Sequence, residues 1–157
     1  FMGTCYDGMK VKKVLSLEEN QNLQARDEKG VIIYDIVKKY EMSSFDYDKD
    51  NISNMFGQEI SVYMSSIGQY ITEYLVNFEF VIEIMKEYGF EPLSSEKLSN
   101  LRVPIGNFEN VIDKVDSLLE DSEIDIHRAY IQAKTVQKDE KYRKLSSLNN
   151  WFIFKKI

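Results

Sequence analysis

The stretch Gln69–Leu93, Q-Y-I-T-E-Y-L-V-N-F-E-F-V-I-E-I-M-K-E-Y-G-F-E-P-L, decides the fold of this chain. It predicts a helix over Asn77–Tyr88, because apolar residues recur at i, i+3, i+4 and i+7 and Gly89 stands where a helix C′ residue is expected. Phe90–Leu93 then predicts a strand. We expect the apolar stripe of the helix to pack in the core; its members are Phe78, Val81, Ile82 and Met85.

Just before this helix, Glu73 is a lone carboxylate in an aromatic and apolar segment, whose other members are Tyr70, Ile71, Tyr74, Leu75 and Val76. A carboxylate offers two acceptor oxygens, so it can accept from two N–H donors on the Watson–Crick edge of a purine while an aromatic ring stacks on the base. The alternative is an ordinary solvated charge, which is the commoner state of a glutamate.

The rest of the chain predicts further helices and strands around this stretch. The predicted helices are Asp7–Leu17 with Asp7 as its N-cap, Phe108–Leu119 and Ile124–Leu145. The predicted strands are Phe1–Thr4, as the end of a buried parallel strand, Val31–Lys38, Glu59–Met64 and Asn150–Lys156. We expect loops over Glu18–Gly30 and Met42–Asn54. This order suits the second half of a doubly wound α/β sheet.

Composition bounds the function classes. The chain has 157 residues, of which 43% are hydrophobic, enough for one domain or part of one. Its net charge of −6 argues against a general nucleic-acid groove, but not against a pocket for a single base. One cysteine, Cys5, excludes an internal disulfide, and one cysteine with one histidine cannot build the usual zinc site. No apolar run approaches the roughly 18 residues that span a bilayer.

A possible calcium loop is incomplete. The segment Asp46–Asn51, D-Y-D-K-D-N, begins like an EF-hand loop, but the glycine and the final glutamate of that motif are missing. The sequence therefore predicts no metal site.

Several segments resemble, in order, the catalytic C-terminal half of mRNA cap guanine-N7 methyltransferases. They are F-M-G-T-C-Y-D-G at Phe1–Gly8, F-G-Q-E-I at Phe56–Ile60, T-E-Y-L-V-N-F at Thr72–Phe78, K-E-Y-G-F at Lys86–Phe90 and W-F-I-F-K-K at Trp151–Lys156. The segments most resemble the methyltransferase part of capping enzymes from large DNA viruses. Residues 94–147 match only loosely.

The resemblance implies a class I, Rossmann-like α/β methyltransferase fold, of which residues 1–157 are the C-terminal part with inserted strands. Phe1–Thr4 is then the fifth strand of the sheet, Phe90–Leu93 the sixth and the strand at Trp151 the seventh. The strands at Val31 and Glu59 are the insertion. The glycine-rich loop that binds S-adenosylmethionine in this family is expected upstream of Phe1, so this chain holds at most the edge of the cofactor site.

The activity implied by the resemblance is methyl transfer from S-adenosylmethionine to N7 of the cap guanine. N7 carries a free lone pair, so positioning and electrostatics suffice and no catalytic acid or base is expected. The implied partners are the capped 5′ end of mRNA and other capping-enzyme domains in the same polypeptide, with no membrane. The location is the host cytoplasm or the virion for a viral protein and the nucleus for a cellular one. The alternatives are a non-catalytic methyltransferase-like subunit and a class I methyltransferase with another acceptor.

The resemblance also implies site residues. Glu73, in the motif E-Y-L-V, holds the guanine through its N1 and N2 hydrogens. Asn149 stands where the family has a tyrosine, and Trp151, two residues on, supplies an aromatic surface on the same strand face or else fills the core. Tyr63 lies near the cap-facing aromatic positions, with a half-buried strand residue as the alternative. Tyr6 stands where cellular members have proline.

Overall fold

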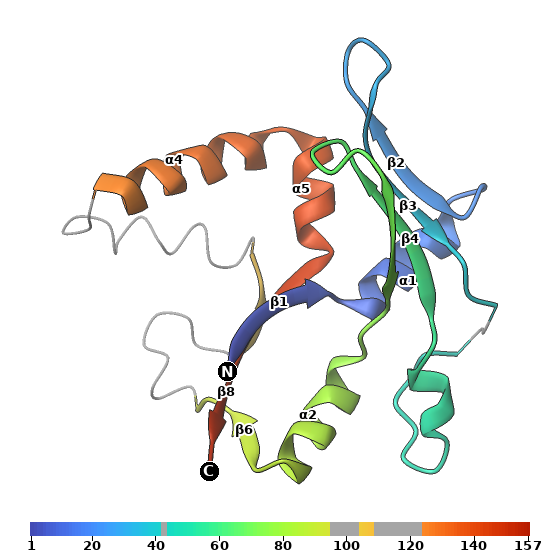
Figure 1. The fold of residues 1–157 in the computed structure, drawn as a ribbon, viewed down its shortest axis with the longest axis vertical. Coiled ribbons are helices and arrows are strands. Elements are labelled where there is room, and N and C mark those ends of the chain that lie inside the picture. The colour runs from blue at the N-terminus through green and yellow to red at the C-terminus, as the bar shows by residue number, and fades with distance from the viewer. Residues whose placement is uncertain (42–43, 95–103, 109–123) are drawn as a thin grey trace. The chain divides into compact units, whose positions relative to one another are not determined.

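The computed structural model describes residues 1–41, 44–94, 104–108 and 124–157. Over these ranges the chain is a mixed α/β protein with two four-stranded sheets whose assigned strand pairs are antiparallel (Figure 1). It divides into two units, one of Tyr6–Glu83 and the other of Phe1–Cys5 with Ile84–Ile157. None of the described helices is both long and apolar enough to cross a membrane.

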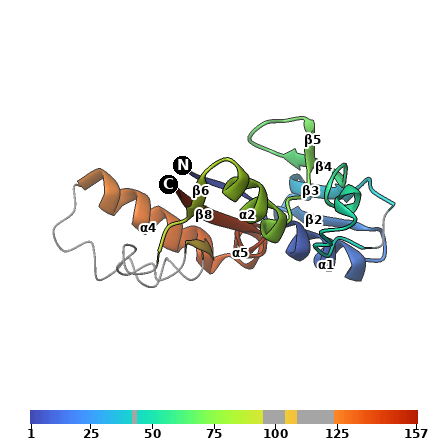
Figure 2. The ribbon, with the colours of Figure 1, turned by 90° about the horizontal axis from the view of Figure 1, so that it is seen from below.

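The unit Tyr6–Glu83 contains a four-stranded antiparallel meander (Figure 2). Its strands are hydrogen-bonded in chain order and comprise β2 (Asn22–Arg26), β3 (Ile32–Lys38), β4 (Glu59–Met64) and β5 (Tyr70–Tyr74). One face supplies much of the core, because alternate residues of a strand point to the same side; it includes Leu23, Tyr34, Ile36, Ile60 and Val62. A short 3₁₀ helix, η1 (Ile52–Met55), precedes β4.

The helix α1 (Gly8–Leu17) begins as predicted at Asp7, whose Oδ1 accepts from the backbone N–H groups of Met9 (3.1 Å) and Lys10 (3.2 Å). Gly8 donates its N–H to the Val76 carbonyl at 2.9 Å. A Cβ on Gly8 would lie 2.4 Å from Phe45 Cε1 and 2.7 Å from the Val76 oxygen. Only glycine therefore lets the start of α1 approach the segment that follows β5.

The helix α2 (Phe78–Glu87) confirms the prediction from the opening stretch. Asn77 fixes its start, since its Oδ1 accepts from the Phe80 N–H at 3.1 Å and its Nδ2 donates to the Phe45 carbonyl at 2.7 Å. Gly89 ends it with φ +74°. The apolar stripe of this helix was expected to pack in the core, but no residue of α2 is fully buried and the stripe residues are half-buried.

The second sheet is built around the last strand of the chain. Its strands are β1 (Met2–Tyr6), β6 (Phe90–Pro92), β7 (Ile105–Asn107) and β8 (Asn149–Lys156). β6 and β7 pair with successive parts of β8, both antiparallel. β1 also pairs with β8, through reciprocal backbone bonds of 2.8 and 2.9 Å between Phe1 and Phe154. The sheet order is therefore β1-β8-β6.

The helix predicted over Ile124–Leu145 is in fact two helices, α4 (Ile124–Lys138) and α5 (Glu140–Ser147) (Figure 1). Asp139 separates them because its backbone is extended, with φ −84° and ψ 118°, and its side chain accepts from the Lys141 N–H at 2.9 Å. An aspartate that can cap a new helix competes with continuing the old one.

Other predictions need correction. The segment Glu18–Gly30, expected to be a loop, contains β2, and neither β5 nor β7 was predicted. The start of β1 is not buried, since Phe1 is 68% and Met2 74% exposed, and its partner among the described strands is the antiparallel β8. The helix predicted over Phe108–Leu119 lies, apart from its first residue, outside the described residues.

Candidate functional site

Glu73 lies on the inner face of the β2–β5 sheet, at its edge strand β5. It is paired with Ile60 of β4, a residue with no exposed surface, so its side chain leaves the sheet on the face that carries the core. Burial raises the pKa of the Glu73 carboxyl above its ordinary value. Within the part of the chain that the structure describes, this carboxylate has no hydrogen-bond or salt-bridge partner.

Tyr6 lies close to Glu73 because of a single parallel bridge between Asp7 and Val76. The bridge places Tyr6, the last residue of β1, beside the end of β5. Burial, the negative charge of Glu73 and the neighbouring Tyr34 together raise the pKa of Tyr6 to about 12. At neutral pH the Tyr6 hydroxyl is therefore a neutral hydrogen-bond donor within electrostatic range of the Glu73 carboxylate.

This pair has the chemistry of a site for a planar polar ring. Glu73 supplies two acceptor oxygens, and Tyr6 supplies one hydroxyl and an aromatic face. A half-buried carboxylate with no partner costs free energy, and such groups concentrate at functional sites. The structure thus brings together two of the five predicted site residues within one unit.

Tyr63 is not beside Glu73. It pairs with Tyr70, three residues from Glu73, so it points to the opposite face of the sheet. The two tyrosine rings lie 5.3 Å apart at an interplanar angle of 47°. Tyr63 is half-buried in the strand, as its alternative interpretation expected.

Beside these two tyrosines lies a buried carboxylate that the sequence did not single out. Asp35 is 4% exposed and accepts from the Tyr70 hydroxyl at 2.8 Å and from Asn22 Nδ2 at 3.0 Å. The hydrogen bond to Asp35 is the main reason why the pKa of Tyr70 is raised. The available signal was an aspartate in the otherwise apolar run Ile32–Val37. Asp35 ties the edge strand β5 to β3, across β4.

Asn149 and Trp151 belong to the other unit. Trp151 is 9% exposed and lies against Gly106 of β7, where a Cβ would come within 2.8 Å of the indole ring. Its Nε1 is buried and has no hydrogen-bond partner among the residues that the structure describes. Asn149 Nδ2 donates to the Leu145 carbonyl at 3.3 Å, at the end of α5. In this unit Trp151 is thus a core residue, which was one of its two interpretations.

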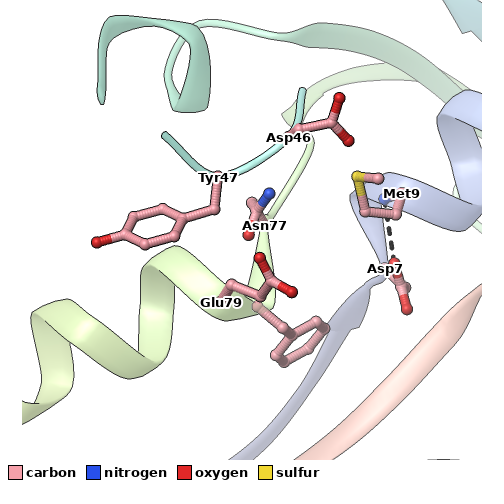
Figure 3. A pocket seen from close by; sticks show the side chains of 7 residues that line it. Asp7, Met9, Asp46, Tyr47, Asn77 and Glu79 are labelled. Carbon is pink, nitrogen blue, oxygen red and sulfur yellow. Dashed lines mark hydrogen bonds between the residues drawn. The ribbon is translucent and has the colours of Figure 1, made fainter. Parts of the chain in front are cut away.

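Two hollows lie outside the Glu73–Tyr6 pair. One, of about 270 Å³, is apolar and is lined by Met2, Gly3, Thr4, Phe108, Trp151, Phe152 and Ile153. The other, of about 260 Å³, is acidic and is lined by Asp7, Met9, Asp46, Tyr47, Asn77, Phe78 and Glu79 (Figure 3). Asp7 is already used in capping α1, and Asn77 in capping α2. Among the described residues no group of three or more histidine, cysteine, aspartate or glutamate side chains is placed to hold a metal ion.

Neither hollow fits S-adenosylmethionine. The apolar hollow has room for an adenine ring but no carboxylate in its lining to bind a ribose. The acidic hollow is formed by a strand end, a loop and the start of α2, without the glycine-rich turn that such a cofactor needs. We therefore assign the cofactor to none of the residues that line these two hollows.

No family model matches the chain, and no curated protein matches its sequence.

Proposed function

We propose that this chain binds and orients the guanine of an mRNA 5′ cap for methylation at N7, as part of a cap guanine-N7 methyltransferase. In this proposal the methyl donor is S-adenosylmethionine, and none of the described residues is assigned to it. The observation that carries the proposal is the half-buried carboxylate of Glu73, which has no hydrogen-bond or salt-bridge partner among the described residues and lies near enough to the Tyr6 hydroxyl to raise its pKa.

The donor pattern of guanine matches this pair. Guanine presents adjacent N1–H and N2–H donors, which suit the two oxygens of Glu73, and its O6 accepts from a donor such as the Tyr6 hydroxyl. Adenine lacks the N1–H and offers a donor where guanine has O6, so it would leave the buried carboxylate unpaired. A polar group left unpaired in a partly desolvated site is the strongest basis for discrimination between bases.

The fold is compatible with the proposal. A class I methyltransferase sheet ends in an antiparallel pair of strands after its fifth strand, and β6 and β8 form such a pair next to β1. The proposed insertion is the separate β2–β5 sheet, whose edge strand carries Glu73. A loop or insertion that brings its own recognition residue to a common scaffold is a usual way to add substrate specificity.

In this proposal the chain's own residues act by positioning. N7 of guanine needs no deprotonation, so the role of Glu73 is to fix the base in one orientation and that of Tyr6 is to complete its polar edge. Holding a reactant in one geometry accounts for a large share of the rate of such transfers.

The test is Glu73→Gln, in the full-length polypeptide that contains this chain. The substitution keeps the size of the side chain but replaces an acceptor oxygen with an NH₂ group that faces the guanine's own donors. We expect a loss of about 2–4 kcal/mol of transition-state stabilisation. This corresponds to a fall of roughly 30- to 1000-fold in kcat/KM for capped RNA. Binding of S-adenosylhomocysteine should be unchanged.

The matched control is Glu59→Gln. Glu59 is half-buried on the neighbouring strand β4, opposite Tyr74, and points to the other face of the same sheet. It should retain wild-type activity. Methylation by Glu73→Gln within about threefold of wild type, which is under 1 kcal/mol, would show that Glu73 does not hold the guanine.

A further inference from the structure

Positive charge is concentrated at the C-terminal end of this acidic chain. Residues 128–157 contain eight of the 20 lysines and arginines but only two of the 26 acidic residues, a net charge of +6. The first 127 residues therefore carry −12, given the overall charge of −6. From residue 141 to the end there is no acidic side chain at all. Such an asymmetry indicates a segment that meets a polyanion.

The two helices α4 and α5 carry most of this charge. Gln137 Nε2 donates to Ser146 Oγ at 2.7 Å, which joins the end of α4 to the last turn of α5. We define the α4–α5 basic surface by five cations and two tyrosines that are distributed around the two helices, since consecutive helical residues point in different directions: Tyr130, Lys134, Lys138, Lys141, Tyr142, Arg143 and Lys144. All seven are exposed or half-exposed.

The two acidic residues of this segment already have a structural role. Asp139 caps α5 by accepting from the Lys141 N–H at 2.9 Å, and Glu140 lies in the first turn of the same helix, where its charge favours the helix dipole. Lys144, in the last turn, favours the other end of the dipole. Lys138 lies in the last turn of α4 in the same way. Capping and the helix dipoles thus account for two cations and both acids, and the other cations of this segment still carry a charge of +6.

Two aromatic rings accompany the cations. Lys134 Nζ lies 5.0 Å from the centre of the Tyr130 ring, and Tyr142 is 37% exposed next to Arg143. Interleaved cations and accessible rings are typical of surfaces that follow a single-stranded nucleic acid, because the cations contact phosphates and the rings stack on bases.

We propose that the α4–α5 basic surface binds the single-stranded RNA that follows the cap, chiefly through its phosphates. This inference rests on the proposed function, because RNA that follows a cap is a ligand only for a cap-binding protein. It assigns the two tasks to different residues: the Glu73–Tyr6 pair reads one base without net positive charge, and the basic surface supplies affinity without reading sequence.

The experiment measures binding of an uncapped, fluorescein-labelled single-stranded RNA of about 20 nucleotides, longer than one such surface needs. Fluorescence anisotropy is recorded from roughly 50 to 300 mM KCl, for wild type and for Arg143→Gln/Lys144→Gln. Both side chains are exposed and glutamine is a good helix former, so circular dichroism should be unchanged. The control is Lys29→Gln/Lys49→Gln, which removes the same charge from two exposed loop positions of the other unit.

We expect the salt dependence, the slope of log Kd against log salt, to fall by about 1.4 in the α5 variant, since each contact with a single strand contributes about 0.7. If wild type and variant have equal dissociation constants at 1 M salt, a slope smaller by about 1.4 makes the variant's dissociation constant roughly 25-fold higher than that of wild type at 0.1 M salt. The control should stay within about twofold of wild type, because its charges lie outside the surface.

Three outcomes would overturn the inference: no RNA binding by wild type, equal weakening in both double variants, or displacement of the RNA by polyglutamate at lower concentration than by polyuridylate. The last would assign the surface to an acidic protein. Because the probe has no cap, none of these results depends on Glu73. A failure of the proposed function appears separately, as equal affinity for capped and uncapped RNA in the wild type.

Discussion

The hydrogen bond from Tyr70 to Asp35 joins the edge strand β5 to the inner strand β3. Its removal should therefore destabilise the β2–β5 sheet. Tyr70→Phe deletes the hydroxyl that lies 2.8 Å from Asp35 Oδ2 and leaves Asn22 as the donor to the other oxygen. Asp35 is 4% exposed, so water cannot fully replace the lost donor. A hydrogen bond to a charged group contributes about 1.5–3 kcal/mol.

We expect the free energy of unfolding of Tyr70→Phe to fall by about 2 kcal/mol, near the middle of that range. For a chain of this size this corresponds to a decrease in Tm of roughly 4–8 °C. Urea denaturation followed by circular dichroism measures the change. The sequence offers a close control, Tyr63→Phe, because Tyr63 stacks on the same ring at 5.3 Å without bonding Asp35.

Tyr63→Phe should cost under about 0.5 kcal/mol, because it keeps the ring and deletes a hydroxyl that makes no hydrogen bond to Asp35. In combination with Asp35→Asn, the effect of Tyr70→Phe should be smaller than in the wild type, since the two changes remove one interaction. Equal stability of the two tyrosine variants would refute the assignment of this bond as a support of β5. Loss of the support should also weaken guanine binding, because Glu73 lies on the same strand.

Three further predictions concern the same unit. Gly8→Ala should lower the free energy of unfolding by about 1–3 kcal/mol in urea denaturation, because its methyl group would lie 2.7 Å from the Val76 carbonyl; a neutral effect would contradict the close packing. Affinity for capped RNA should fall as the pH is lowered, and the fall should begin at a higher pH than the ordinary pKa of glutamate predicts. The reason is that Glu73 has a raised pKa, so that its carboxylate is protonated and lost as an acceptor at a higher pH; Glu73→Gln should show no such titration. Stability should fall between pH 10 and about 12, where an unfolded tyrosine is ionised while the folded Tyr6 is still protonated, and Tyr6→Phe should reduce this loss in urea titrations at each pH.

Local signals in the sequence were enough for the elements that local interactions stabilise. The N-cap Asp7 and the apolar spacing after it predicted α1, and the stripe ending at Gly89 predicted α2. A β-branched run predicted β3 to within one residue, and an alternating run predicted the bounds of β4. The apolar setting of Glu73 drew attention to that residue, and the family resemblance added Tyr6; the structure places both in one unit, near enough for the charge of Glu73 to raise the pKa of Tyr6.

Tertiary structure alone decided the elements and faces that depend on distant partners. β2, N-L-Q-A-R, has no strong strand pattern, whereas β5, Y-I-T-E-Y, is rich in strand-forming residues but only five residues long. Both form because β3 and β4 offer hydrogen-bonding edges. The register of that pairing sends Glu73 to the core face and Tyr63 to the other, since a shift of one residue exchanges the faces of a strand. Asp35 became a binding group for Tyr70 only because residues 35 positions apart meet across β4. Local sequence fixes backbone preference, but which side chains meet depends on pairing between segments far apart in the chain.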